Sequence, residues 1–150
     1  MSRVQIAASA LNFSEELRVK SEELKAELES PKPDISERSV AYSLRLINFY
    51  RDLEKDSVGR ILGKQLLRAG TSVGANVHEA QGGHSRADFI AKMTIAYKEI
   101  REALYWLRLI QSSKLSLGSQ VEGLLSETQQ LVKILSSILL TSKKNGASRR

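Results

Sequence analysis

The sequence has no cysteine, only two prolines and few aromatic residues, and each shortage limits the structures or sites that the chain can form. Without cysteine the chain can form neither a disulfide nor a thiolate metal site, and it lacks a cysteine nucleophile. Both prolines, Pro31 and Pro33, lie early in the chain, so proline bars no later segment from being helical. Aromatic residues make up 5% of the chain, while leucine, alanine, glutamate and lysine are common, which favours helices over sheets.

Long hydrophobic runs are also missing. No segment approaches the roughly 20 apolar residues that a membrane-spanning helix needs. The short apolar stretch at the N-terminus is interrupted by Gln5 and Ser9, so it does not resemble an export signal. We therefore expect a cytoplasmic protein without a membrane partner, which the lack of cysteine also suits.

Positive charge is in excess and unevenly distributed. The formal charge is +6, yet residues 1–40 carry more acidic than basic side chains, and residues 41–150 hold the basic excess. A basic surface attracts polyanions because binding releases their condensed counterions. Since few aromatic residues accompany the charges, we do not expect base stacking to be the main mode of binding.

Hydrophobic spacing predicts an all-α protein with three parts. Residues 1–35 are expected to form an N-terminal arm, partly helical or disordered, with a helix that begins near Ser14. Residues 36–141 contain four amphipathic segments joined by short connections, which predicts an up-down antiparallel four-helix bundle. Residues 142–150 are expected to be a basic disordered tail.

Apolar stripes predict which helix faces are buried. In the first bundle helix the stripe consists of Val40, Leu44, Ile47 and Tyr50, with Leu46 and Leu53 beside it. The helix that begins near residue 85 has two adjacent stripes, so it should contact more than one neighbour. The last helix has a heptad seam from Leu117 to Ile138, which is typical of a bundle core or a subunit interface. We therefore expect a homo-oligomer.

Catalytic, metal and cofactor motifs are poorly supported. His78 and His84 lie six residues apart with Gly82-Gly83 between them, so they do not share a helix face for a metal ion. The segment 59–65 imitates a phosphate-binding loop, but it is one residue short and lacks the final Ser/Thr. We predict a protein that is not an enzyme and that has no cofactor and no metal.

Basic side chains on two consecutive helices are the candidate nucleic-acid contacts. Arg60, Lys64 and Arg68 follow one another at i, i+4 and i+8 and form one cationic stripe. Lys92, Lys98 and Arg101 lie on the following helix. The alternative is a solvated face whose cations are partly paired with acids across the bundle.

A row of polar residues follows the same helix as the cationic stripe. Arg68, Ser72, Asn76 and Glu79 continue along one face, and Gly70 and Gly74 beside them should let two helices pack closely. The next helix opens with a capping-box pattern, Ser85 to Asp88. We interpret the row as a structural or interface feature, with nucleic-acid contact as the alternative.

The stretch from Lys64 to Met93 closely resembles the four-helix-bundle proteins named for the 23S rRNA intervening sequence. Members of that family carry Arg, Ser and Asn-x-x-Glu along one helix, then Ser-x-x-Asp/Glu-Phe at the start of the next. The positions that fill this pattern are Arg68, Ser72, Asn76, Glu79, Ser85, Asp88 and Phe89. The resemblance covers roughly residues 38–140.

This resemblance implies a basic bundle that assembles as a homopentameric ring. Some members are encoded within insertions in 23S rRNA genes. Distant relatives, the accessory variability determinant proteins of retroelements, bind nucleic acid and a reverse transcriptase. We thus expect a non-enzymatic, homo-oligomeric protein that binds RNA or DNA non-specifically, with a link to rRNA or a partner protein such as a reverse transcriptase. The alternative is a protein–protein adaptor ring that does not bind nucleic acid.

Overall fold

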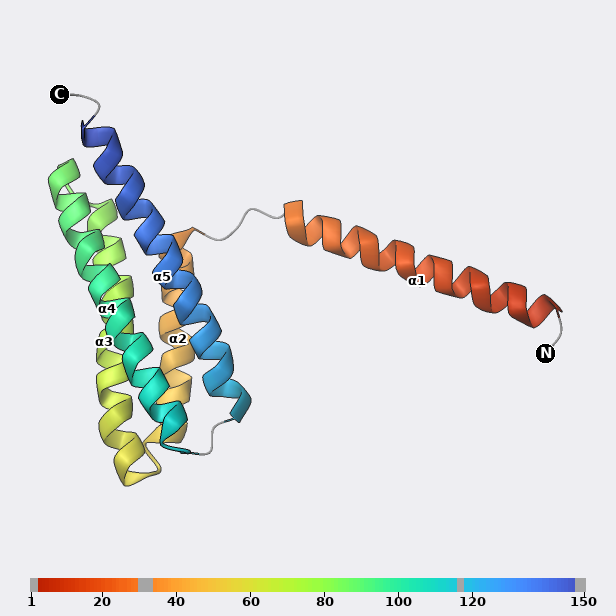
Figure 1. Cartoon of the computed structure of the whole chain (residues 1–150), viewed down its shortest axis with the longest axis horizontal. Coiled ribbons are helices and arrows are strands. Elements are labelled where there is room, and N and C mark those ends of the chain that lie inside the picture. Colours follow the sequence, from red (N-terminus) through yellow and green to blue (C-terminus); the bar gives the residue numbers. More distant parts are fainter. Residues whose placement is uncertain (1–2, 30–33, 116–117, 148–150) are drawn as a thin grey trace. The chain divides into compact units, whose positions relative to one another are not determined.

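The computed structural model describes residues 3–29, 34–115 and 118–147, which contain five α-helices and no strand. The helices are α1 (Arg3–Glu29), α2 (Ile35–Leu53), α3 (Ser57–Gln81), α4 (Arg86–Ser112) and α5 (Gly118–Ala147), coloured along the chain in Figure 1. The all-α prediction is therefore confirmed. The chain divides into two compact units, Met1–Lys32 and Pro33–Arg150.

The first unit consists of the single helix α1. It begins at Arg3, well before the predicted start near Ser14, because the stretch Ala7-Ala-Ser-Ala-Leu11 is rich in strong helix formers. Its apolar side chains Leu11, Phe13 and Leu17 are all exposed to solvent. The arm is thus a helix that exposes apolar side chains along part of its length.

The second unit is a helical bundle of α2, α3, α4 and α5 (Figure 1). Helix α4 packs against both α3 and α5, and α2 packs against α3 and, less extensively, against α5. One continuous core joins them, in which the largest fully buried side chains include Tyr42, Leu46, Phe49, Ile100 and Leu131. None of the helices in the described ranges combines the length and apolar character required to cross a membrane.

Glycines on α3 let α2 approach closely. A Cβ atom added at Gly70 would lie 1.9 Å from Leu46 Cδ1, so the leucine fills the space that the glycine leaves. At Gly74 the nearest atom, Ser43 Oγ, would be 3.5 Å away, which is an ordinary contact distance. The predicted close helix packing is confirmed at Gly70, whereas Gly74 leaves room for a methyl group.

The buried face of α2 differs in part from the predicted one. Leu46 and Leu53, predicted beside the main stripe, are buried, and Tyr50 of that stripe is partly buried. Val40, Leu44 and Ile47 are 44%, 57% and 36% exposed, whereas Tyr42, Leu46, Phe49 and Leu53 form the core side of the helix. Both sets recur at helical spacing, so periodicity alone does not choose between them. The glycines of α3 select the buried set, because Gly70 accommodates Leu46 and Tyr42 of the second set. Gly63 lies against Leu53 of the same set and also against Tyr50 of the predicted stripe. The first set remains as an exposed apolar stripe on α2.

The faces of α4 and α5 agree with the predicted patterns. Helix α4 buries Met93, Ile100 and Leu107 in the core and partly buries Phe89 and Trp106 beside them. The seam of α5 is also used within the bundle, where its buried members are Val121, Leu124, Thr128, Leu131 and Leu135. Leu117, the first residue of the predicted seam, lies outside the described residues. The described members of the seam are therefore used in the core of the bundle.

The predicted end of the last helix is too early. Helix α5 continues to Ala147, so residues 142–147 are helical and the expectation of a disordered tail is wrong for them. Lys144 in the last turn favours this extension, because a cation stabilises the negative end of the helix dipole. Residues 148–150 lie outside the described part of the chain.

Candidate nucleic-acid interface

The three cations of the α3 stripe are all exposed, but their surroundings differ. Arg68 forms ion pairs with Glu102 and with Glu99, both on α4. The Nε atom of Arg60 donates a hydrogen bond to the backbone oxygen of Glu54 at 3.2 Å. Lys64 has no ion-pair partner within residues 3–29, 34–115 and 118–147. A phosphate would thus meet an unpaired lysine and two arginines that already have acceptors.

Arg68 belongs to a charged cluster that joins α3 to α4. The Glu102 carboxylate accepts hydrogen bonds from the Trp106 indole N–H, at 3.1 Å, and from Arg68. These donors lower the pKa of Glu102, and its carboxylate in turn raises the pKa of Arg68. Glu99 Oε2, which lies 3.7 Å from Arg68 Nη1, is buried and accepts no hydrogen bond within the described residues. The cluster favours a structural role for Arg68.

The rest of the polar row makes contacts within α3 or with α4. Asn76 Nδ2 donates to the backbone oxygen of Ser72 at 2.8 Å, one turn earlier in the same helix. Glu79 forms an ion pair with Lys92 of α4. Lys92, which is one of the predicted phosphate contacts, therefore already has an acidic partner. The Glu79–Lys92 pair fits the interpretation that the row fixes the packing of α3 against α4, whereas the Asn76 bond only satisfies a polar group within α3.

The capping-box residues stabilise the start of α4. The Ser85 hydroxyl accepts a hydrogen bond from the backbone N–H of Asp88 at 3.1 Å, as predicted for the N-cap. The Asp88 carboxylate accepts from the Ser85 hydroxyl at 2.8 Å, where a capping box would bring it to the backbone N–H of Ser85. Phe89 then packs partly buried against the core. These motif positions define a helix start.

The two remaining predicted cations lie on the opposite flank of α4. Lys98 and Arg101 line a cavity of about 350 Å³ between α4 and α5, together with Lys143 of α5. The Arg101 guanidinium lies over the Tyr97 ring, 5.8 Å from its centroid. The sequence did not assign Lys143 to a site, because it falls in the predicted disordered tail. The structure therefore divides the six predicted cations between two regions of the bundle.

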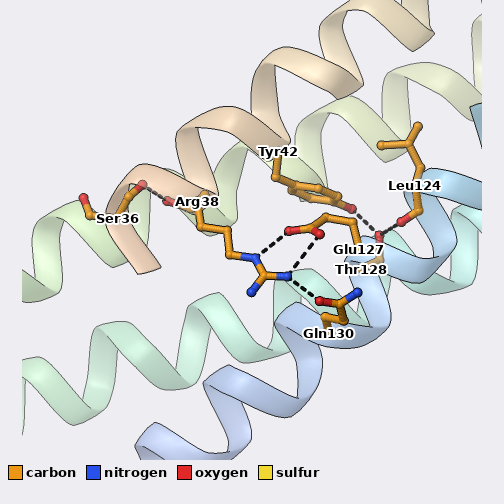
Figure 2. Close-up of polar contacts among 8 residues, drawn as sticks. Ser36, Arg38, Tyr42, Leu124, Glu127, Thr128 and Gln130 are labelled. Atoms are coloured by element: carbon orange, nitrogen blue, oxygen red, sulfur yellow. Dashed lines mark hydrogen bonds and ion pairs between the residues drawn. The ribbon is translucent and has the colours of Figure 1, made fainter. Parts of the chain in front are cut away.

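A polar network between α2 and α5 was not predicted from the sequence (Figure 2). Arg38 donates two hydrogen bonds to the Glu127 carboxylate, at 2.7 and 3.1 Å, and one to Gln130 at 2.6 Å. Deeper in the bundle, the Tyr42 hydroxyl lies 2.7 Å from Thr128 Oγ1. Thr128, a polar residue in an otherwise apolar heptad seam, was the sequence signal for a buried partner.

The described bundle also contains two further cavities and two histidines. A cavity of about 230 Å³ is lined by residues of α2 and α5 that include Arg45 and Asp52, and another of about 390 Å³ lies where α4 ends and α5 begins. The His78 ring lies 3.3 Å from Ser36 Oγ, and His84 is exposed. Within the described parts of the chain, no three His, Cys, Asp or Glu side chains are grouped to hold a metal ion.

Comparison with known proteins places these features in a family. Residues 32–137 match the family described as 23S rRNA-intervening sequence protein. No curated protein matches the chain. A crystal structure of a protein of unknown function, from the S23 ribosomal protein family of Bacteroides thetaiotaomicron, is similar to this chain with a TM-score of 0.67 and 37% identity. The similarity covers 71% of this chain and 98% of that one.

Proposed function

Because this chain belongs to the 23S rRNA-intervening sequence protein family, we propose that it is a non-enzymatic, homo-oligomeric protein that binds nucleic acid through its phosphates. The family description names an intervening sequence of 23S rRNA and no activity, so the proposal rests on the side chains themselves. RNA and DNA both carry the required phosphates, and the binding is expected to be non-specific.

Cations without acidic partners are the observation that supports this proposal. Lys64, Lys98 and Arg101 form no ion pair with any side chain of the described helices. The basic excess of residues 41–150 adds a positive field around them. Unpaired cations gain more from a phosphate than cations that must first leave a carboxylate, as Arg68 and Lys92 would have to do.

We further propose that the bundle has the up-down antiparallel arrangement. Contacts between successive helices support it, since the end of one helix lies beside the start of the next. A Cβ at Gly63, early in α3, would lie 2.8 Å from Tyr50, late in α2. Likewise, Arg86 at the start of α4 donates to the backbone oxygen of Ser142 near the end of α5.

The exposed apolar stripe on α2 supports self-association. Val40, Leu44 and Ile47 recur at i, i+4 and i+7, so they form one strip along the helix. Single exposed apolar side chains are common, but an aligned set usually marks an interaction surface. The resemblance to the family suggests a homopentameric ring as the assembly that covers this strip.

Leu44→Glu is expected to convert the oligomer to a monomer while the bundle stays folded. Leu44 is 57% exposed, so glutamate costs little within one chain but places a charge in the apolar contact between copies. Light scattering coupled to size exclusion measures the mass. Ile95→Glu on α4, a residue 41% exposed, is the matched control and should leave the mass unchanged. A monomeric wild-type protein at micromolar concentration would contradict the proposal.

An adaptor function is the second candidate, and the same α2 stripe favours it. If this stripe receives a different protein, the positive charge serves solubility or an acidic partner. A reverse transcriptase is the partner that the family resemblance suggests. Binding of labelled RNA and DNA at low salt separates the two candidates. We expect a Kd of about 10 μM or tighter for nucleic acid. No binding to either polymer would leave the adaptor function.

A further inference from the structure

We propose that the groove between α4 and α5 binds one unpaired nucleotide of a single-stranded nucleic acid, with its phosphate on the cationic rim and its base on the apolar floor. This inference rests on the proposed function and assigns a place and a strand preference to it. The rim consists of Lys98 and Arg101 from α4 and Lys143 from α5. The floor consists of Leu139 and Leu140 of α5, with Tyr97 of α4 beside them.

The spacing of these residues builds the groove from two parallel rows. Lys98 and Arg101 are three positions apart on α4, as are Leu140 and Lys143 on α5, so each helix presents its pair on one face. The cations therefore lie on both sides of the cavity. A bound anion would contact both helices and would not depend on a single flexible side chain.

Helix α4 directs its acids away from this groove. Glu99 and Glu102 directly follow Lys98 and Arg101 in the sequence, but their carboxylates pair with Arg68 on the α3 side. Within the described helices, none of the three rim cations forms an ion pair. Three positive charges gathered without a carboxylate repel one another, and a phosphate relieves that repulsion.

The floor indicates that the ligand is apolar as well as anionic. Leu140 is 60% exposed although it lies in a cavity, so it offers apolar surface that no other side chain of the described bundle covers. The Tyr97 ring and the Arg101 guanidinium contact each other and extend this surface. A free phosphate would leave the leucines in water, whereas a nucleotide covers them with its base.

The size of the groove favours one unpaired nucleotide of a single strand over a duplex. Its volume of about 350 Å³ is at the small end of ligand sites, which run from roughly 300 to 1,000 Å³. In a duplex the bases are stacked and paired, so only the rim cations could reach the backbone. Single strands expose their bases, and therefore contact the rim and the floor together.

The test compares labelled single-stranded and duplex RNA and DNA of the same sequence, by fluorescence anisotropy at several salt concentrations. Lys98→Gln/Arg101→Gln/Lys143→Gln should weaken single-strand binding at least tenfold and reduce the salt slope by about 0.7, the contribution of one phosphate contact on a single strand. The matched control Arg51→Gln/Lys55→Gln/Lys114→Gln removes equal charge elsewhere and should weaken binding less than threefold. Thermal melts followed by circular dichroism verify that both triple variants are folded.

Leu140→Ser tests the floor without changing the charge. We expect single-strand binding to weaken about fivefold, because serine removes apolar surface that the base would cover, while duplex binding is unchanged. Adenosine monophosphate should compete only far above the Kd of the strand, because a free nucleotide lacks neighbouring phosphates. Its competition near the Kd of the strand would instead assign the groove to free nucleotides.

Four outcomes would overturn the inference, and they can be told apart. If wild type binds duplex as tightly as single strands, or if the groove triple variant equals its control, the groove is not the site although nucleic-acid binding stands. Unchanged single-strand binding by the Leu140→Ser variant would show that the base does not contact Leu140. If wild type binds no nucleic acid at low salt, the proposed function fails together with the inference.

Discussion

Thr128→Val is expected to lower the free energy of unfolding by about 1–3 kcal/mol, and Tyr42→Phe by less. Both residues are buried between α2 and α5 (Figure 2). Thr128 donates its single hydroxyl proton to the backbone oxygen of Leu124 at 2.7 Å, so Tyr42 must donate to Thr128. Valine would leave the tyrosine hydroxyl buried without an acceptor, whereas phenylalanine leaves Thr128 still bonded to Leu124.

Denaturant unfolding of both single variants and of the double variant measures this asymmetry. In the double variant both hydroxyls are absent, so its loss of stability should be smaller than the sum of the two single losses. The burial that raises the pKa of Tyr42 also keeps its hydroxyl protonated as a donor at ordinary pH. A loss for Tyr42→Phe that equals or exceeds the loss for Thr128→Val would contradict the assigned donor direction.

Gly59→Ala is expected to destabilise the bundle by about 1–3 kcal/mol through overpacking. A Cβ at this position would lie 2.4 Å from the backbone oxygen of Leu53, which cannot rotate away as a side chain can. The turn between α2 and α3 is also fixed by Asp56, whose carboxylate accepts hydrogen bonds from the backbone N–H groups of Val58 and Gly59 at 2.9 and 2.8 Å. Relief of the clash would disturb this N-cap.

Gly74→Ala is the matched control, since it adds the same methyl group to the same buried side of α3. Its nearest contacts would begin at 3.5 Å, and alanine gains up to about 1 kcal/mol in helix propensity. We therefore expect Gly74→Ala to be neutral or stabilising in thermal and denaturant unfolding. Equal destabilisation by both variants would mean that α2 and α3 pack differently from the described contacts.

The later helices, apart from the C-terminal end of α5, could be predicted closely because local signals mark their ends and faces. Ser85 caps α4, Gly82 follows α3, and the seam of α5 has an unbroken heptad spacing. The buried face of α2 could not be predicted in this way, because its two apolar stripes have equal periodicity. Only the partner helix, with Gly70 facing Leu46, decides which stripe is covered.

The candidate site could be predicted only in part. The sequence identifies Lys98 and Arg101 as basic residues of one helix, but its spacing cannot reveal that the neighbouring acids turn toward Arg68. Lys143 lies more than forty residues farther along the chain, so only tertiary packing brings it to the same groove. The α3 stripe was identified from its spacing, but the ion pair that occupies Arg68 depends on the packing of α3 against α4.

The measurement that tests the central claim most directly is the affinity of the wild-type protein for labelled single-stranded RNA across a salt series. The account predicts binding that weakens steeply with salt, with a slope of log K against log salt of about −2 or steeper, because each neutralised phosphate on a single strand contributes about −0.7. Binding that does not respond to salt, or no binding at low salt, would contradict phosphate recognition by this bundle.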